Sequence, residues 1–422
     1  MAVLMAATCF SRKMPHPLPF QFNEAANPFF TDCCPLMSNA WSWIPTEIAK
    51  LKASNLDRHL RRRESPPVAG RIQLDGKQML NLGSNDYLGL AADSRVVDAV
   101  KRFAGYHGWG SGASPLVNGR GTLHEVLETQ ISEFEGTDSA LLFPSGFSAN
   151  VGVISALIDE DSVVFSDEKN HASIIDGIRL SMAQKQIYRH VDVNHLEELL
   201  KNQNSAQRKL IVTDSLFSMD GNLAPLKEIA QLADQYGAML MIDEAHATGV
   251  YGPNGQGLHE LVTFENEPLI IGTMSKAMGS IGGFAAGPQS VIEWLWNRAR
   301  SYMFSTALPE VTCAASLAAL EILRKEPHRR IELLETAHWL REQLNDRGWN
   351  TAHSTSQIIP LVIGDAGRTR ALSQRLYDQG FFVPVIRPPA VPADFSMLRI
   401  SLSWQHQRKD LESLLEALGR AS

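Results

Sequence analysis

Short apolar segments alternate with segments of helical periodicity between about residue 93 and residue 290. The apolar segments are ALLF (140–143), SVVFSD (162–167), KLIVTDSLFSM (209–219), AMLMIDEAH (238–246), LIIGTMSK (269–276) and GGFAAG (282–287). The helical patterns lie at 94–104, 122–135, 146–157, 172–183, 194–202 and 225–236. Apolar strands that alternate with helices predict a mostly parallel sheet covered by helices on both faces. We therefore expect an α/β fold whose ligand site lies beyond the carboxyl ends of the strands.

The residues before this region predict two further parts. Residues 1–40 lack periodicity, and we interpret them as an N-terminal extension that is disordered or that results from a start codon placed too early. The N-terminal segment 41–92 contains an amphipathic pattern over 46–63, which predicts a helix. A hairpin around the Asp-Gly pair at 75–76 is expected to follow.

The remaining sequence predicts a division into two domains. We expect a large domain over 93–309 and a smaller α+β domain, with its connecting helix, over 310–422. In the smaller domain helical patterns run to about residue 346, and IIPLVIGD, FFVPVI and MLRISLS have the pattern of strands.

The composition excludes several classes of protein. The 422 residues carry a net charge of −7, which argues against a nucleic-acid coat and against a polybasic membrane binder. The four cysteines form no Cys-x-x-Cys pair and no cluster with histidines, so we expect no metal site and a reducing, cytoplasmic location. No uncharged apolar stretch of about 18 residues occurs, which argues against a membrane span.

Polar residues stand at the ends of the apolar segments, where a site is expected. They are Asp243, Glu244 and His246 in one segment, Ser218 and Asp220 in another, Thr273, Ser275 and Lys276 in a third, and His171 after a fourth. A buried polar group loses hydration unless a partner satisfies it, so several of them on successive strands indicate a site. Each residue alone is more often a cap or a loop residue.

Lys276 stands in GTMSKAMGSIGG, where the glycines allow a ligand to approach closely. A solvated loop lysine is one interpretation. A phosphate loop is another, but it requires Ser or Thr after the lysine, and Ala277 follows. A lysine that forms a Schiff base is the third. Asp243 would then suit a pyridinium nitrogen, because two charges about 4 Å apart attract by about 4 kcal/mol at an effective dielectric constant near 20.

The segment FPSGFSAN (143–150) predicts a strand, a turn and a helix start, whose free N–H groups suit a phosphate. Together with NLGSNDYLGL, GSGASPLVNGRGTLHEVLE, NHASIIDG, SLFSMDG, MIDEAHATGVYG, GTMSKAMGSIGG and FSTALPE, this segment resembles the α-oxoamine synthases. They are a fold-type-I family that depends on pyridoxal 5′-phosphate (PLP). The resemblance extends from about residue 45 to the C-terminus. It implies a mostly parallel sheet in a large domain, a smaller α+β C-terminal domain, PLP as cofactor, and a homodimer with the site at the subunit interface.

The resemblance also implies roles for single residues. Lys276 matches the lysine that binds PLP covalently, Asp243 the partner of the pyridine nitrogen, and His171 the histidine stacked on the ring, and these three are the expected catalytic residues. The other expected cofactor contacts are Gly146, Phe147 and Thr273 at the phosphate, Ser218 and His246 near the phenolic oxygen, and Ser305 and Thr306 at the phosphate of the second subunit.

The expected substrate contacts are Asn85, Arg399, Arg61 and Ala390. Arg399 matches an arginine that holds the amino acid carboxylate, for which a planar guanidinium is better suited than an ammonium. Arg61 matches an acyl-substrate contact, although a solvated helix end remains an alternative. Ala390 stands where a threonine is usual, so the acyl specificity is less constrained than the chemistry. Asp214 and Pro115 are further departures from the family pattern.

The segment VIRPPAVP (385–392) resembles the family members that condense L-alanine with a pimeloyl thioester, carried by coenzyme A or by a carrier protein. Relatives that act on glycine tend to have an aromatic residue where Arg387 stands. Three alternatives remain open: a family member with another amino acid and acyl chain, a fold-type-I aminotransferase, and a binding protein without catalysis.

Overall fold

The computed structural model describes residues 40–203 and 208–420. The chain divides between Ala53 and Ser54 into two units. In the first unit, helix α1 spans Trp43–Ala53. The predicted helix over 46–63 is therefore wrong beyond Ala53. Asn55 has a left-handed backbone with φ 56°, a conformation that ends helices. The extension predicted over 1–40 lies almost wholly outside the described residues.

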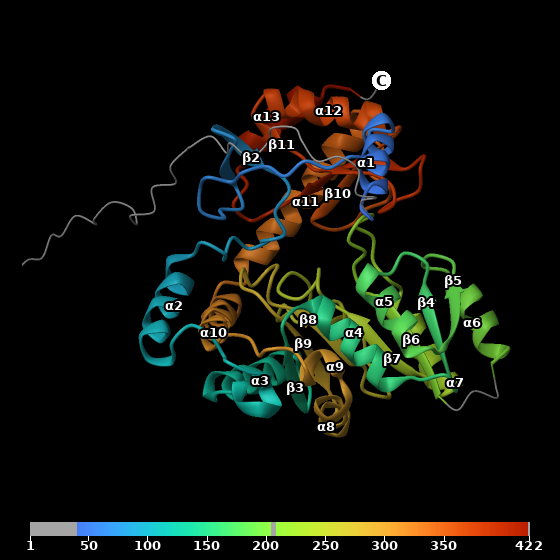
Figure 1. Ribbon diagram of the computed structural model, residues 1–422. Helices are drawn as coiled ribbons and strands as arrows, with labels where there is room; N and C mark the ends of the chain where they lie inside the picture. The colour runs from blue at the N-terminus through green and yellow to red at the C-terminus, as the bar shows by residue number, and fades with distance from the viewer. Residues whose placement is uncertain (1–39, 204–207, 421–422) are drawn as a thin grey trace, which may run out of the picture. The chain divides into compact units, whose positions relative to one another are not determined.

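Seven strands form the central sheet of the second unit, in the order β3-β9-β8-β7-β6-β4-β5 (Figure 1). Their bounds are Ser139–Phe143 (β3), Ser162–Asp167 (β4), Gln184–Tyr188 (β5), Arg208–Asp214 (β6), Met239–Asp243 (β7), Leu269–Thr273 (β8) and Gly283–Gly287 (β9). Strand β9 is antiparallel to both of its neighbours, and the other pairs are parallel. The predicted mostly parallel sheet is confirmed. Strand β5 was not predicted, because its sequence QKQIY is polar and lies exposed at the sheet edge.

Helices cover both faces of this sheet because neighbouring strand residues point to opposite sides. Val164, Leu210 and Met241 belong to a buried cluster with residues of α4 (Gly146–Leu157), α5 (Ala172–Ser181) and α8 (Gln289–Arg298). Val163, Ile211 and Leu240 belong to another with residues of α3 (Thr122–Glu135), α6 (Val193–Lys201) and α7 (Leu226–Tyr236). Shorter or flanking elements are α2 (Ser94–His107), α9 (Arg300–Met303), a π-helix at Pro115–Gly119 and a 3-10 helix at His259–Leu261.

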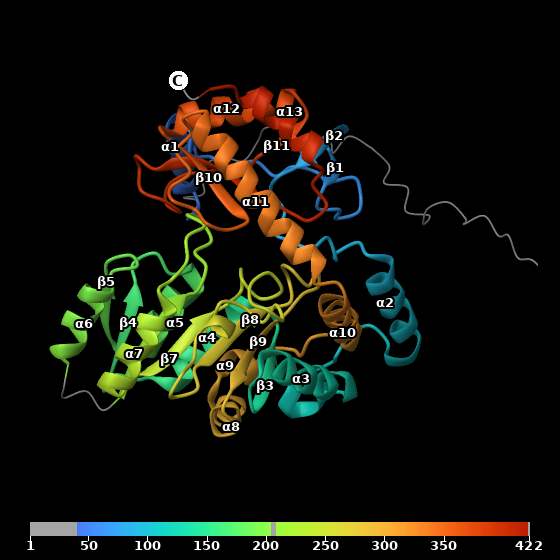
Figure 2. The ribbon, with the colours of Figure 1, turned by 180° about the vertical axis from the view of Figure 1, so that it is seen from behind.

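Two three-stranded sheets lie in the rest of the second unit. The orders are β1-β2-β11 and β10-β13-β12, with bounds Arg71–Leu74 (β1), Lys77–Asn81 (β2), Ile358–Gly364 (β10), Phe381–Phe382 (β11), Val385–Ile386 (β12) and Ser396–Ser401 (β13). The helices are α10 (Glu310–Lys325), α11 (His328–Asp346), α12 (Ala366–Asp378) and α13 (Arg408–Leu418). Figure 2 shows α11 running from the end of α10 to the sheet that contains β10.

The predicted hairpin is confirmed. Asp75 and Gly76 have φ values of 47° and 78°, as the central residues of a type I′ turn require. Strand β2 also pairs in parallel with β11, so the hairpin shares a sheet with the C-terminal part of the chain. The segment FFVPVI contributes to two sheets, because β11 and β12 are separate strands. Within the described ranges, no helix is long and apolar enough to cross a bilayer.

Candidate active site

The carboxyl ends of β8, β7, β6 and β4 lie at one edge of the central sheet, because these neighbouring strands are mutually parallel. Asp243 is the last residue of β7, and Thr273 is the last residue of β8. Lys276 follows β8 by three residues, and His171 is the N-cap of α5, four residues after β4. The structure therefore places these four predicted residues at the expected edge of the sheet.

Lys276 is a partly buried amine among charged groups. Burial lowers the pKa of its ammonium from 10.5 to about 8. The carboxylates of Asp243 and Asp214 oppose this shift, and the guanidinium of Arg399 adds to it. At pH 7 about a tenth of the amine is therefore neutral. Such an amine can attack a carbonyl or remove a proton.

Asp243 is buried, and both oxygens of its carboxylate are hydrogen-bonded. The Ala245 N–H donates to Oδ1 at 2.9 Å, and the Asn150 Nδ2–H donates to Oδ2 at 2.6 Å. Asn150, in the second turn of α4, also donates to Ser173 Oγ in the first turn of α5 at 2.9 Å, which fixes the amide. The carboxylate is thus held in one position, from which it can stabilise a cationic group.

His171 lies near the carboxylates of Asp214 and Asp243 and near Phe147 at the start of α4. Its backbone N–H donates to Asp214 Oδ2 at 2.7 Å, and its imidazole ring lies 6.4 Å from the Phe147 ring, edge to face. Burial lowers the pKa of the imidazole; the Asp243 carboxylate opposes the shift, and the Lys276 ammonium reinforces it. Burial and the carboxylate of Asp243 raise the pKa of Asp214 well above its usual value. The imidazole is therefore favoured in its neutral form.

The N-terminus of α4 lies against the end of β8. A Cβ added to Gly146 would lie 3.3 Å from the Cβ of Thr273. Ser145 caps the helix by accepting the Ser148 N–H at 3.1 Å, and Gly146 and Phe147 form its first turn. The first N–H groups of a helix have no acceptor within the helix, so this turn can bind an anion.

Arg399 reaches the site from β13, in one of the smaller sheets. Its Nε–H donates to the Ser218 carbonyl at 2.6 Å, and its Nη1–H donates to Asn85 Oδ1 at 3.2 Å. Two of its five N–H groups are used in this way, which leaves the others for a carboxylate. The three residues were all predicted as site residues, and the structure brings them together.

His246 is buried close to Lys276 and Arg399. Its Nδ1 lies 2.6 Å from the Tyr87 hydroxyl. Burial lowers the pKa of the imidazole well below 6.5, and the charges of Lys276 and Arg399 contribute in the same direction. A neutral imidazole is thereby maintained next to Lys276.

No contact joins the other predicted residues to Lys276 in the described part of the chain. Ser305 and Thr306 lie on a pocket with Arg120, His124, Glu128 and Tyr302. The Arg61 guanidinium lies 3.9 Å from the centre of the Tyr377 ring and donates to Asp75 Oδ2 at 3.2 Å. Ala390 is exposed and donates its N–H to the Arg387 carbonyl at 3.1 Å. Their roles remain predictions.

Sequence reasoning missed Asn150 and Tyr87, which hold Asp243 and His246 in place. Both residues stand in segments that were singled out, FPSGFSAN and NLGSNDYLGL, but neither received a role. An asparagine in the second turn of a buried helix was the available signal for Asn150, because a buried amide requires partners.

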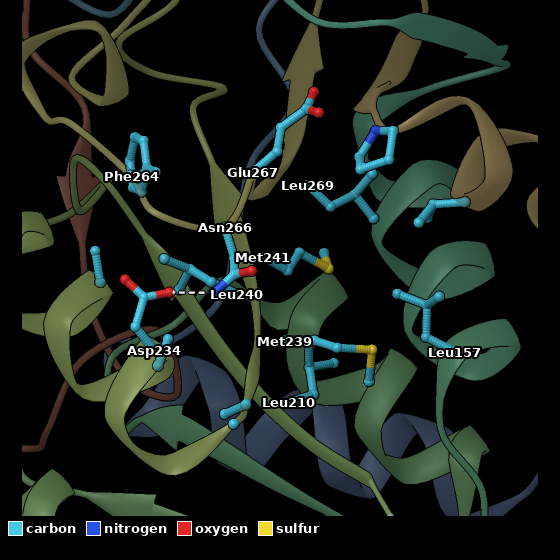
Figure 3. Close-up of a pocket in the computed structure, with 16 residues that line it drawn as sticks. Leu157, Leu210, Asp234, Met239, Leu240, Met241, Phe264, Asn266, Glu267 and Leu269 are labelled. Carbon is cyan, nitrogen blue, oxygen red and sulfur yellow. Dashed lines mark hydrogen bonds between the residues drawn. The ribbon is translucent and has the colours of Figure 1, made fainter.

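A second pocket opens at the opposite, amino-terminal edge of the sheet (Figure 3). Its volume is about 360 Å³, and its lining is mostly apolar, with Leu157, Met239 and Phe264 among the residues. Asp234 accepts a hydrogen bond from the Asn266 amide there at 2.7 Å. The lining contains none of the predicted site residues. Among the residues that the structure describes, no group of three His, Cys, Asp or Glu is placed to hold a metal ion.

Comparison with known proteins yields a consistent set of relatives. The model of the family "Aminotransferase class I and II" matches residues 77–418. An 8-amino-7-oxononanoate synthase of Anaeromyxobacter dehalogenans is 46% identical over 90% of this chain and 95% of its own. 8-Amino-7-oxononanoate synthase 2 of Bacillus subtilis is 42% identical over 89% of this chain and 96% of its own.

Solved structures give the same result for the fold. A serine palmitoyltransferase from S. paucimobilis, in a complex with PLP and myriocin, has a TM-score of 0.84 at 30% identity, covering 90% of this chain and 96% of that one. An 8-amino-7-oxononanoate synthase from Francisella tularensis has a TM-score of 0.70 at 25% identity, covering 81% of this chain and 96% of that one. The predicted fold type, with its mostly parallel sheet, is confirmed.

Proposed function

The chain belongs to the class I and II aminotransferase family, and on this premise we propose that it condenses L-alanine with a pimeloyl thioester, using PLP. The products are 8-amino-7-oxononanoate, CO2 and a free thiol. The observation that carries the chemistry is the lysine of lowered pKa, Lys276, among Asp243, Asp214 and Arg399. The choice of substrates is supported by the names of relatives that are 42–46% identical over about 90% of the chain.

The residues present fit PLP. Lys276 supplies an amine for the aldehyde, and the first turn of α4 offers the N–H groups of Gly146 and Phe147 to the phosphate. The buried carboxylate of Asp243, fixed by Asn150, suits the ring nitrogen. Bound PLP would act as an electron sink for the negative charge that proton removal leaves on the α-carbon of the amino acid.

We assign binding of the alanine carboxylate to Arg399 and removal of the α-proton to Lys276. Arg399 holds the carboxylate in a fixed direction, because the Ser218 carbonyl and Asn85 Oδ1 restrain its guanidinium. Lys276 removes the α-proton in its neutral form and then carries that proton as an ammonium. With a pKa of about 8, the amine is a base strong enough to do so without being fully protonated near neutral pH.

The carbon–carbon bond forms between the α-carbon of alanine and the carbonyl carbon of the thioester. The thiolate leaves and takes up a proton. The carboxylate of alanine is lost as CO2, which leaves an electron pair on the α-carbon, and the Lys276 ammonium returns its proton to that carbon. His171, beside Asp243 and Phe147, is the side chain that we assign to hydrogen bonding with the developing oxyanion. A hydrogen-bond donor that is already fixed in place stabilises the developing negative charge better than water does, because water molecules must first reorient.

A homodimer is part of this proposal. Ser305 and Thr306 lie at a pocket whose lining does not include Lys276, as expected if they serve the site of the neighbouring subunit. Mixing Lys276→Ala protomers with protomers that carry Ser305→Ala and Thr306→Ala tests this directly. Partial recovery of activity supports a shared site, and no recovery despite exchanged subunits contradicts it.

The function is tested by thiol release from purified protein with PLP. L-Alanine with pimeloyl-CoA is compared with glycine and acetyl-CoA, and Lys276→Ala serves as the inactive control. We expect release with the first pair alone. Release only with glycine, or formation of a keto acid without thiol release, would assign the chain to another reaction of the family.

A further inference from the structure

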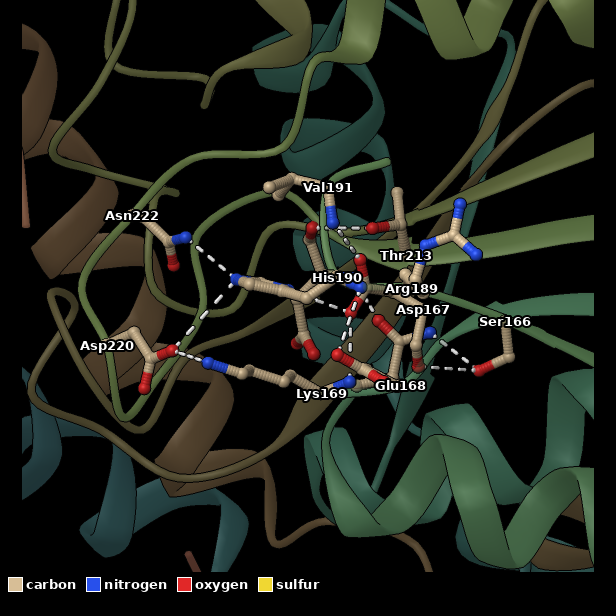
Figure 4. Close-up of polar contacts among 12 residues, drawn as sticks. Ser166, Asp167, Glu168, Lys169, Arg189, His190, Val191, Thr213, Asp220 and Asn222 are labelled. Carbon is tan, nitrogen blue, oxygen red and sulfur yellow. Dashed lines mark hydrogen bonds and ion pairs between the residues drawn. The ribbon is translucent and has the colours of Figure 1, made fainter. Parts of the chain in front are cut away.

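A cluster of polar side chains surrounds His190 next to the proposed active site (Figure 4). We call Asp167, Lys169, His190, Asp220 and Asn222 the His190 cluster. Its members come from the end of β4, the turn after β5 and the loop after β6. The proposed function assigns no role to any of them.

Asp167 fixes the first side of the imidazole. This carboxylate is 2% exposed, and its Oδ1 lies 2.9 Å from His190 Nδ1. Its Oδ2 accepts the Val191 N–H at 2.8 Å. Val191 has φ 51°, a left-handed conformation that is costly for a β-branched residue. Such a conformation persists only where the surrounding contacts enforce it, so the turn that carries His190 is held firmly in place.

The other side of the imidazole contacts the loop after β6. His190 Nε2 lies 2.7 Å from Asn222 Nδ2 and 4.0 Å from Asp220 Oδ2. The ring of Phe217 meets the imidazole edge to face, with the centroids 4.4 Å apart. Lys169 forms an ion pair with Asp220. His190 therefore links the firmly held end of β4 to both ends of the Phe217–Asn222 loop.

This loop presents Ser218 to the active site. The loop is closed by the Phe217 N–H, which donates to the Asn222 carbonyl at 3.1 Å. Within the loop, the Ser218 carbonyl accepts the Nε–H of Arg399 at 2.6 Å. A shift of the loop would therefore move one of the two acceptors that orient the guanidinium.

We propose that His190 is a positioning residue for amino acid binding. It holds the Phe217–Asn222 loop, hereafter the Ser218 loop, in place and thereby orients the guanidinium of Arg399. The proposal rests on the role of Arg399 in the proposed function. Loss of the contact between His190 and Asn222 is expected to weaken the binding of L-alanine about tenfold or more. The reason is that a misdirected Arg399 guanidinium loses a charge-assisted hydrogen bond to the carboxylate of L-alanine. Binding of the acyl thioester is expected to change much less.

Two substitutions test the contact between His190 Nε2 and Asn222. His190→Gln places an amide near the position of Nε2, so it can keep the contact with Asn222. His190→Phe keeps a ring edge toward Phe217 but loses both polar contacts. We expect His190→Gln to retain L-alanine binding better than His190→Phe. Asn222→Ala removes the contact from the loop side and is expected to resemble His190→Phe, which keeps the test valid if one variant fails to fold.

His195→Gln is the matched control. His195 Nδ1 accepts the Arg189 N–H at 3.0 Å, so this residue supports the same turn without touching the Ser218 loop. Thermal unfolding is measured for all variants. A purely structural role for His190 predicts lower stability in His190→Gln, His190→Phe and Asn222→Ala, with an unchanged KM for L-alanine.

The measurement is the binding of L-alanine to the PLP-loaded protein, followed by the absorption spectrum without acyl thioester, together with KM and kcat. Weaker L-alanine binding in His190→Phe and Asn222→Ala, but not in His195→Gln, supports the proposal. Equal binding in all variants overturns it. If the unaltered protein itself does not bind L-alanine, the proposed function has failed instead.

Discussion

Raising the pH from about 6 to about 9 is expected to destabilise the fold through a buried trio, Glu135, His259 and Glu244. His259 Nδ1 lies 3.1 Å from Glu244 Oε1, and Nε2 lies 3.5 Å from Glu135 Oε2. Burial raises the pKa of Glu135 to about 8, although His259 opposes the shift. Burial lowers the pKa of His259, but the hydrogen bond and charge of Glu244, with the charge of Glu135, outweigh it and raise the value to about 9.

Both shifts have the same sign of effect on stability. The pKa of Glu135 in the folded protein is above its unfolded value of 4.5. The free energy of unfolding is therefore highest below pH 4.5 and falls as the pH rises from 4.5 to about 8. His259 contributes stability that is present below 6.5 and lost as the pH rises through about 9. Between about pH 6 and about pH 9, each group differs in protonation between the folded and unfolded protein over about two pH units. This difference corresponds to a loss of about 3 kcal/mol in the free energy of unfolding. Since the two shifts share one contact, we expect a total loss near that figure and not twice as much.

Urea unfolding at the two pH values measures this loss. Glu135→Gln removes the titrating carboxyl, so its loss of stability is expected to be smaller than that of the unaltered protein by at least about 1 kcal/mol. Glu133→Gln, an exposed position on the same helix, is the control and should behave as the unaltered protein does. Identical pH dependence in Glu135→Gln and the unaltered protein would refute the reasoning.

Three further outcomes are expected. Arg399→Lys should raise the KM for L-alanine about tenfold or more, with a smaller effect on kcat, because an ammonium cannot hold Asn85 and a carboxylate in one planar arrangement; steady-state kinetics test this. Gly221→Ala should lower the free energy of unfolding by about 2 kcal/mol or more, since φ is +70° and the new Cβ would lie 2.1 Å from the Ile358 carbonyl oxygen; an unchanged urea midpoint contradicts it. Cys313 is buried, which raises the pKa of its thiol to about 12, so maleimide should leave it unlabelled in the folded protein, as peptide mass mapping would show.

The periodicity of the sequence predicts the central sheet because each strand is buried on both faces. Such strands consist of apolar residues throughout, and the polar residue that ends each one is conspicuous, as Asp243 is at the end of MLMID. The edge strand β5 has no such signal, since Gln184–Tyr188 is exposed on most of its length. Only the pairing of β5 with β4 shows that it is a strand.

The limit of helix α1 does not follow from the apolar spacing, and the supports of the site depend on contacts between residues far apart in the sequence. The apolar spacing continues to Leu60, yet the helix ends at Ala53 and Leu60 is fully exposed. Asn150 reaches Asp243 across 93 positions of sequence, and Tyr87 reaches His246 across 159. The candidate catalytic residues could be found from motifs, whereas the partners of Asn150 and Tyr87 could be found only from the fold.

In the proposed function, catalysis and amino acid recognition originate in different sheets, and this has a consequence for specificity. Lys276 and Asp243 follow strands of the central sheet, whereas Arg399 lies in β13 of a smaller sheet. The Ser218 loop belongs to the central sheet, but the guanidinium of Arg399 rests on it. A substitution that shifts this loop would therefore alter how an amino acid is held while it leaves the lysine and its carboxylate in place. Changes in amino acid preference within this fold are thus expected to arise in the Phe217–Asn222 loop and its supports before they arise among the proposed cofactor contacts.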